Sequence, residues 1–195
     1  MNYHNYLKLL IEQEENSSND TGIYSKEFKD WFGDWENDSE HSSKVVDENG
    51  KPLVVYHGTD KEFNVFDKNK TGKNYWQGKD AFFFTDKLNS AKNYAKNSND
   101  NGKVISAYLD IKNPYLENAI DYCGAVDKYD MNAADIVNKA IGKGNDGIII
   151  KSSQGSLYVA FYPNQIKSIY NNGKWDKNSP NIYESYKNYI NERIK

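Results

Sequence analysis

Three short apolar segments decide the fold of this chain: VVYHGT at residues 54–59, AFFFTD at 81–86 and YVAFYPNQ at 158–165. Each has the length and the β-branched or aromatic content of a buried strand. Each also ends in polar residues, where a strand leaves the core and its side chains become accessible. We therefore expect a sheet whose strand ends carry the functional groups of the protein.

The other elements follow from local patterns on either side of these segments. The Asn-Gly pair at 49–50 predicts a hairpin turn. Apolar runs predict further strands at 104–111, 146–150 and 166–170, and they set the strand of the third segment at 157–162. Apolar residues recur at helical spacing in 3–15, 25–35, 89–95, 133–141 and 183–194. Together these patterns predict an α+β fold, in which a compact, mostly antiparallel β core is surrounded by helices.

This pattern divides the chain into three parts. They are an N-terminal helical extension at 1–42, a core domain at 43–182 and a C-terminal helix at 183–195. Within the extension, Ser25 is placed to cap a helix. The aromatic residues of that helix fall on one face, which we interpret as core packing rather than a ligand box: Phe28, Trp31, Phe32 and Trp35.

Composition narrows the class of protein. A chain of 195 residues with a net charge of -3 has no strong basic field, so we expect no nucleic-acid partner. One cysteine, Cys123, excludes an intrachain disulfide framework and a cysteine-based zinc cluster. No apolar stretch has the length of a membrane span, and no metal-ligand spacing is present. These features lead us to expect a cytoplasmic protein without a metal.

The order of the three segments resembles the ADP-ribosyltransferase superfamily, in the form found in polyvalent proteins of phages and mobile elements. In that superfamily three strands carry His, then Tyr, then Glu. More distantly, FFTD at 83–86 and AKNY at 91–94 are similar to the Tyr-Phe-Ala-Asp and Ala-Asn-Tyr segments of poly(ADP-ribose) polymerases. The resemblance implies a split β-sheet, NAD as the substrate, and a site of action in the cytoplasm of a bacterial host.

The resemblance also assigns candidate roles to residues. It implies that His57 bonds a ribose hydroxyl and that the backbone around Gly58 and Thr59 approaches the nicotinamide amide. Phe83 falls at the Tyr position and keeps the aromatic face for stacking. Tyr94 either lines the same pocket or packs, and we favour packing. The alternatives are a His57 that a backbone carbonyl or Thr59 satisfies, and a Phe83 that belongs to the sheet core.

The third motif departs from the superfamily, because Leu157 falls at the Glu position. A carboxylate there would grip a ribose hydroxyl and stabilise a cationic transition state, which Leu cannot do. Gln154 and Ser156 are candidate substitutes and, with His57, make up the candidate catalytic residues. Asp146 is better interpreted as a turn residue, and Gln165 as a brace that bonds backbone.

The sequence is compatible with functions from two different classes, an enzyme and a binding protein. One is an enzyme that uses NAD to mono-ADP-ribosylate a host protein. A component of a host defence system is one candidate for this target. The alternative is a catalytically degenerate transferase fold that binds and inhibits a host defence complex without turning over NAD. An NAD hydrolase without a protein acceptor is a third possibility. The sequence leaves the oligomeric state open.

Overall fold

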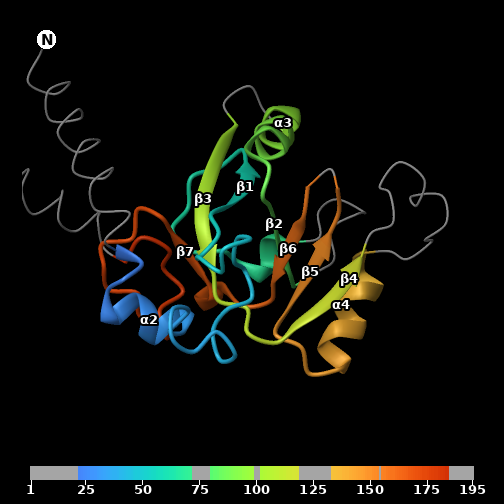
Figure 1. The fold of residues 1–195 in the computed structure, drawn as a ribbon. Helices are drawn as coiled ribbons and strands as arrows, with labels where there is room; N and C mark the ends of the chain where they lie inside the picture. The colour runs from blue at the N-terminus through green and yellow to red at the C-terminus, as the bar shows by residue number, and fades with distance from the viewer. Residues whose placement is uncertain (1–21, 72–79, 99–101, 119–132, 154, 185–195) are drawn as a thin grey trace, which may run out of the picture.

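The computed structural model describes residues 22–71, 80–98, 102–118, 133–153 and 155–184, and is built on one seven-stranded, mostly antiparallel sheet (Figure 1). The strand order is β4-β5-β6-β2-β1-β3-β7. The strands are β1 (Val55–Thr59), β2 (Phe82–Thr85), β3 (Lys103–Leu109), β4 (Pro114–Asn118), β5 (Gly147–Lys151), β6 (Leu157–Ala160) and β7 (Ile166–Ser168). The described helices are α2 (Lys26–Phe32), α3 (Leu88–Ser98) and α4 (Ala133–Gly142), with short 3-10 helices η1 (Lys68–Lys70) and η2 (Pro163–Gln165). The α+β fold expected from the sequence is confirmed.

The sheet is split at its centre, between β1 and β2. These two strands share a single residue pair, Tyr56 with Thr85. By contrast, β1 pairs with β3 through five residues, and β2 pairs with β6 through four. The two halves of the sheet therefore part beside His57 and Phe83, where the first two sequence motifs meet.

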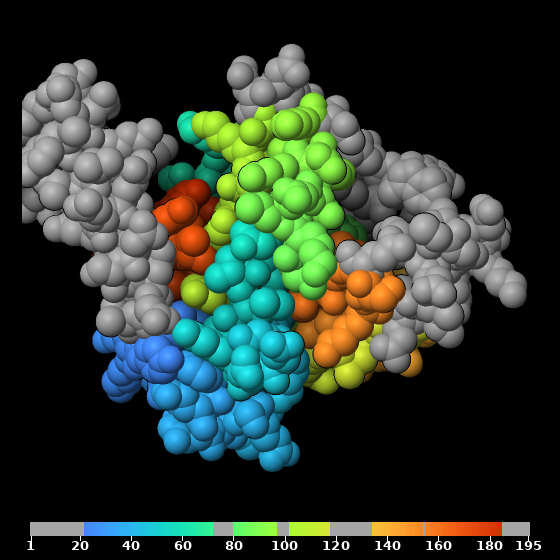
Figure 2. Space-filling view, turned by 45° about the horizontal axis from the view of Figure 1, so that its top comes forward, coloured from blue at the N-terminus to red at the C-terminus, as the bar shows by residue number. Residues whose placement is uncertain are grey.

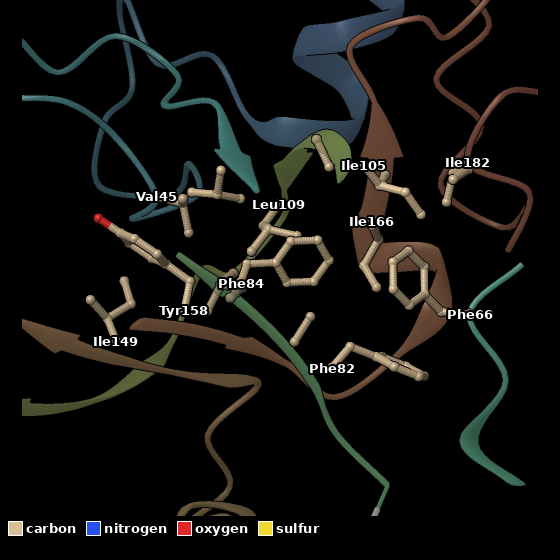
Figure 3. Close-up of a cluster of buried hydrophobic side chains, with 14 residues drawn as sticks. Val45, Phe66, Phe82, Phe84, Ile105, Leu109, Ile149, Tyr158, Ile166 and Ile182 are labelled. Atoms are coloured by element: carbon tan, nitrogen blue, oxygen red, sulfur yellow. The ribbon is translucent and has the colours of Figure 1, made fainter. Parts of the chain in front are cut away.

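The larger core cluster fills one face of the sheet (Figure 3). Phe82 and Phe84 of β2 point into it, as strand alternation requires. Loops rather than helices cover this face in the described part of the chain, and they contribute Val45, Phe66 and Ile182. We call it the loop-covered face.

The opposite face carries the helices, and we call it the helix-covered face. There α4 packs on Ile148 and Val159, α2 packs on Tyr108, and α3 lies over β1 and β3. Phe83 belongs to this side, again as alternation predicts.

The predicted aromatic helix forms at 26–32, and Ser25 caps it by accepting a hydrogen bond from the Phe28 amide at 3.1 Å. Phe28, Trp31 and Phe32 are core, as expected, whereas Trp35 lies beyond the end of the helix and packs against the same cluster. Trp31 stacks on Trp175, with ring centroids 5.7 Å apart. Trp175 is distant from Trp31 in the sequence, and no local pattern indicates that it joins this cluster. The cluster ties α2 to the sheet.

Three expectations about individual elements need correction. The hairpin predicted at the Asn-Gly pair turns at Gly50, but its strands reduce to the bridge between Val46 and Pro52. The N–H groups of Val45 and Lys51 donate to the Ser43 hydroxyl and the Asp47 carboxylate instead of to the opposite strand. The sequence offers Asp86 or Asn89 as the N-cap of α3, but Asp86 does not fill this role. Its carboxylate accepts a hydrogen bond from the backbone N–H of Ser156 at 2.9 Å instead. Finally, the Asn-Pro pair at 113–114 predicts the end of the strand at 104–111, but β3 already ends at Leu109. Pro114 instead begins β4, an edge strand that pairs in parallel with β5.

The predicted helix at 3–15 and most of the one at 183–195 lie outside the described residues. Glu184, which is described, has a positive φ of 48° and is not helical. The domain boundaries at 42 and 182 stay predictions. None of the described helices is long and apolar enough to cross a membrane.

Candidate active site

His57 bridges the split in the sheet. Its Nδ1 atom lies 2.8 Å from the backbone carbonyl oxygen of Phe83. Because a carbonyl can only accept, Nδ1 must carry the proton and donate it. In the neutral imidazole this leaves Nε2 as a lone-pair acceptor, and no described residue bonds to it. A backbone carbonyl does bond His57, as the alternative interpretation of this residue predicted. This bond uses only one of the two ring nitrogens.

Aromatic rings surround the imidazole on the loop-covered face. The centroids of Phe66, Phe84 and Phe63 lie 5.0, 5.4 and 6.5 Å from that of His57. Burial among these rings lowers the pKa of His57, and the hydrogen bond to Phe83 opposes this only in part. The side chain is consequently neutral at pH 7 and held in one tautomer, as a hydrogen-bond acceptor for a hydroxyl requires.

Gly58 points the other way, toward α3. A Cβ at this position would lie 2.2 Å from the carbonyl oxygen of Ala91, so only glycine lets the helix pack this closely. The space-filling view shows α3, in green, lying directly on the teal segment that contains β1 (Figure 2). The glycine thus has a packing role that the sequence did not indicate, beside the predicted approach of its backbone to an amide.

The other predicted NAD contacts fall into two groups. Phe83 is half-buried on the helix-covered face, within the cluster that includes Val159. Thr59 shares a face with His57, and its Oγ1 accepts a hydrogen bond from the backbone N–H of Lys61 at 3.2 Å. Tyr94 is 40% exposed on α3, so the expectation that it packs into the core is wrong. His57 and Phe83 therefore point to opposite faces of the sheet, and the contact between them is the hydrogen bond from the imidazole to the Phe83 backbone carbonyl.

Leu157 lies in a row of side chains that crosses the helix-covered face. It pairs with Thr85 on one side and with Ile150 on the other. It is half-buried and packs against the apolar cluster of that face. A carboxylate at this position would share its face with Phe83 and Gly58. In this chain the position is apolar.

The candidate substitutes that the structure describes make other contacts than one with Leu157. Ser156 lies beside Tyr158, which points to the loop-covered face. Gln154 lies outside the described residues. Asp146 is a turn residue, as interpreted from the sequence, because its carboxylate accepts hydrogen bonds from the backbone N–H groups of Lys112 at 2.7 Å and Asn113 at 2.9 Å.

Gln165 is the brace that the sequence indicated. Its Oε1 accepts from the backbone N–H groups of Phe161 and Tyr162, and its Nε2 donates to the carbonyls of Asp110 and Asp146. All four distances are 2.9 Å. The side chain is buried, so these bonds satisfy backbone groups that water cannot reach.

Two residues of the Leu157 row were not singled out from the sequence. Tyr56 pairs with Thr85 and places a phenol ring on the same face as Phe83. Glu117 pairs with Ile150 and is the carboxylate of this row among the described residues. It lies two strands from Leu157, which is roughly 10 Å between Cα atoms. Only the register of the parallel β4–β5 pair reveals this alignment, and no sequence motif marks it.

A split α+β sheet with a neutral histidine at the split defines the class: an ADP-ribosyltransferase-like domain. The chain belongs to the family described as ADP-ribosyltransferase in polyvalent proteins, whose family model matches residues 47–176. Neither a curated protein nor a solved structure matches the chain significantly. The resemblance drawn from the three motifs is thereby confirmed at the level of the family.

Proposed function

We propose that this domain binds NAD at the split between β1 and β2 and transfers ADP-ribose to a protein of a bacterial host, in the service of a phage or mobile element. The observation that carries the proposal is His57. Its tautomer is fixed by Phe83, its pKa is lowered by burial, and its Nε2 remains available to a ribose hydroxyl. A histidine serving packing alone would not need an acceptor kept free beside a gap in the sheet.

In this proposal the nicotinamide ring stacks on Phe83 on the helix-covered side, and its amide reaches the Gly58 backbone from the split between β1 and β2, because Ala91 of α3 already covers the face of Gly58. The reaction breaks the bond between the nicotinamide nitrogen and the ribose, and nicotinamide leaves with the bonding electrons. The ribose then carries positive charge until a nucleophile of the target attacks it. His57 orients the ribose as a neutral acceptor, and the aromatic rings around it exclude water.

The reaction is expected to be slow, because nothing at Leu157 stabilises this charge. By analogy with the loss of one oxyanion-hole donor, the missing group lowers the rate by about 10²–10³-fold. Glu117 is too distant to replace it in the described geometry, since two strand spacings exceed the reach of one side chain.

A second candidate function is a stoichiometric binder that occupies a host complex without turning over NAD. The observation that favours it is Leu157 itself, which is integrated into the apolar cluster around Phe83. In this version the fold is kept as a scaffold, and a host protein is recognised through its surface.

One experiment separates the two functions. The protein is incubated with NAD labelled in the ADP-ribose moiety and with host lysate, and both label transfer and nicotinamide release are measured. His57→Ala should abolish both signals, whereas His41→Ala, which alters an exposed histidine bonded to Asp38, should not. A stable complex with a host protein that forms without NAD and survives His57→Ala would support the binder. Free ADP-ribose without labelled protein would indicate hydrolysis instead.

A further inference from the structure

A buried ion pair on the edge strand β7 has no part in the proposed reaction. The side chain of Lys167 is fully buried, and that of its partner Glu184 is 3% exposed. The Lys167 Nζ also donates to the carbonyls of Ser179 at 2.9 Å and Asn181 at 3.3 Å, while Glu184 accepts from the backbone N–H of Asp176 at 3.0 Å. Buried charges are tolerated only when their hydrogen-bonding positions are satisfied, and here they are.

The pair holds the segment 179–184 against β7. The backbone N–H of Ser168 donates to the Ile182 carbonyl at 3.0 Å, which docks the segment on the strand. The Asn181 side chain accepts hydrogen bonds from the backbone N–H groups of Tyr183 and Glu184 at 2.9 and 3.1 Å. The positive φ of Glu184 is unfavourable for a residue with a side chain, so the surrounding contacts must maintain it.

The other side of this segment builds the wall of the His57 site. The backbone N–H of Ile182 donates to the Asn64 carbonyl at 2.8 Å, and Asn181 forms an antiparallel bridge with Val65. Asn64 and Val65 lie between the two phenylalanines whose rings flank the imidazole of His57. The side chain of Ile182 is buried next to Phe66 in the same cluster (Figure 3).

We propose that the Lys167–Glu184 pair is a positioning device for the His57 site. It fixes the segment 179–184 to β7, and this segment fixes Phe63 and Phe66 around the imidazole. The proposal rests on the proposed function only in naming NAD as the ligand. Residues 177–184 follow the stretch that the family model matches, so the wall of the site is completed from outside that stretch.

The test uses the full chain with the double substitution Lys167→Met and Glu184→Gln, which removes both charges and leaves neither unpaired. The first readout is the pKa of His57, followed by NMR of the imidazole in the absence of NAD, with exposed His41 as an internal reference. The second is the affinity for NAD by calorimetry. Val137→Ala is the matched control, because it opens a cavity under α4 on the other face of the sheet.

In the double variant the aromatic wall loosens and water reaches the imidazole, so the pKa of His57 should rise toward its ordinary value. The affinity for NAD should fall about tenfold, because binding must then reorder the wall. Val137→Ala should leave the pKa of His57 unchanged. It serves as a control for this readout alone, because Val137 shares its cluster with Phe83, where we place the nicotinamide. A folded double variant in which His57 titrates as in the parent protein would overturn the proposal.

Should the double variant not fold, Asn181→Ala decides the question. It keeps both charges and removes the two hydrogen bonds that shape the end of the segment. The pKa of His57 should again rise, and an unchanged pKa in folded Asn181→Ala would contradict the proposal. The pKa of His57 is measured without a ligand. A parent protein that fails to bind NAD would therefore contradict the proposed function without affecting this test.

Discussion

Replacing Leu157 by Glu should turn a slow enzyme into a faster one. Leu157 shares its face with Phe83 and Gly58, so a carboxylate introduced there would approach the ribose from the side where we place the nicotinamide. Supplying one group that stabilises developing charge is worth about 2.7–4 kcal/mol, or a 10²–10³-fold rate increase. Leu157→Gln is the matched control, because Gln has the size of Glu without its charge.

The substitution also carries a stability cost that the structure bounds. Leu157 is only partly exposed, so Leu157→Glu gives up most of the 1.5–3 kcal/mol that burying a leucine contributes, roughly 1–2.5 kcal/mol. A loss of this size lowers the melting temperature by about 2–10 °C in a chain of this length. The fold should therefore survive, and circular dichroism during heating verifies that it does.

The assay is the initial rate of nicotinamide release from NAD at pH 7.5, for the parent protein and both variants. We expect Leu157→Glu to exceed both the parent and Leu157→Gln by about 10²-fold or more. Suppose instead that Leu157→Glu folds and binds NAD as the parent does, yet releases nicotinamide no faster than Leu157→Gln. The reasoning that places the ribose on this face of the sheet would then be refuted.

Three further predictions concern stability. Gln165→Leu should cost about 3 kcal/mol or more in urea denaturation, because it strands four backbone groups, and a loss below about 1 kcal/mol would contradict the brace. Gly58→Ala should cost about 1–3 kcal/mol and shift the amide NMR signals of α3, since its Cβ would overlap Ala91; unshifted signals would contradict this packing. Burial raises the pKa of Asp110 to about 6, above its unfolded value of about 3.9, so its carboxyl costs stability as pH rises between these values. Asp110→Asn should therefore raise the free energy of unfolding at pH 7 by at most about 3 kcal/mol and leave it nearly unchanged at pH 3, whereas equal effects at both pH values would count against the shifted pKa.

Local sequence patterns predicted the features that depend on neighbours along the chain. Strand alternation placed Phe83 on the opposite face from Phe82 and Phe84, and this is confirmed. Helical spacing identified the aromatic core stripe of α2. The order of the three motifs indicated the family, and Gln165 was interpreted from the sequence as a brace that bonds backbone.

Features that depend on register between distant strands did not follow from the sequence. The sequence gives the face of each residue within its own strand, but not how β1 is aligned with β2. Only the pair of Tyr56 with Thr85 reveals that His57 and Phe83 point to opposite faces. Likewise, the alignment of Glu117 with Leu157 depends on the parallel β4–β5 pair, and the close contact of Gly58 with α3 depends on helix packing.

The most direct test of the central claim is a titration of the protein with NAD, followed by NMR of the His57 imidazole and by calorimetry. The account predicts a saturable shift of the His57 signal, an unchanged His41 signal, and loss of the calorimetric binding in His57→Ala. The contrary result is a folded protein in which NAD produces no saturable response, or in which His57→Ala binds NAD as tightly as the parent. Either outcome would show that the split in this sheet does not bind NAD through His57.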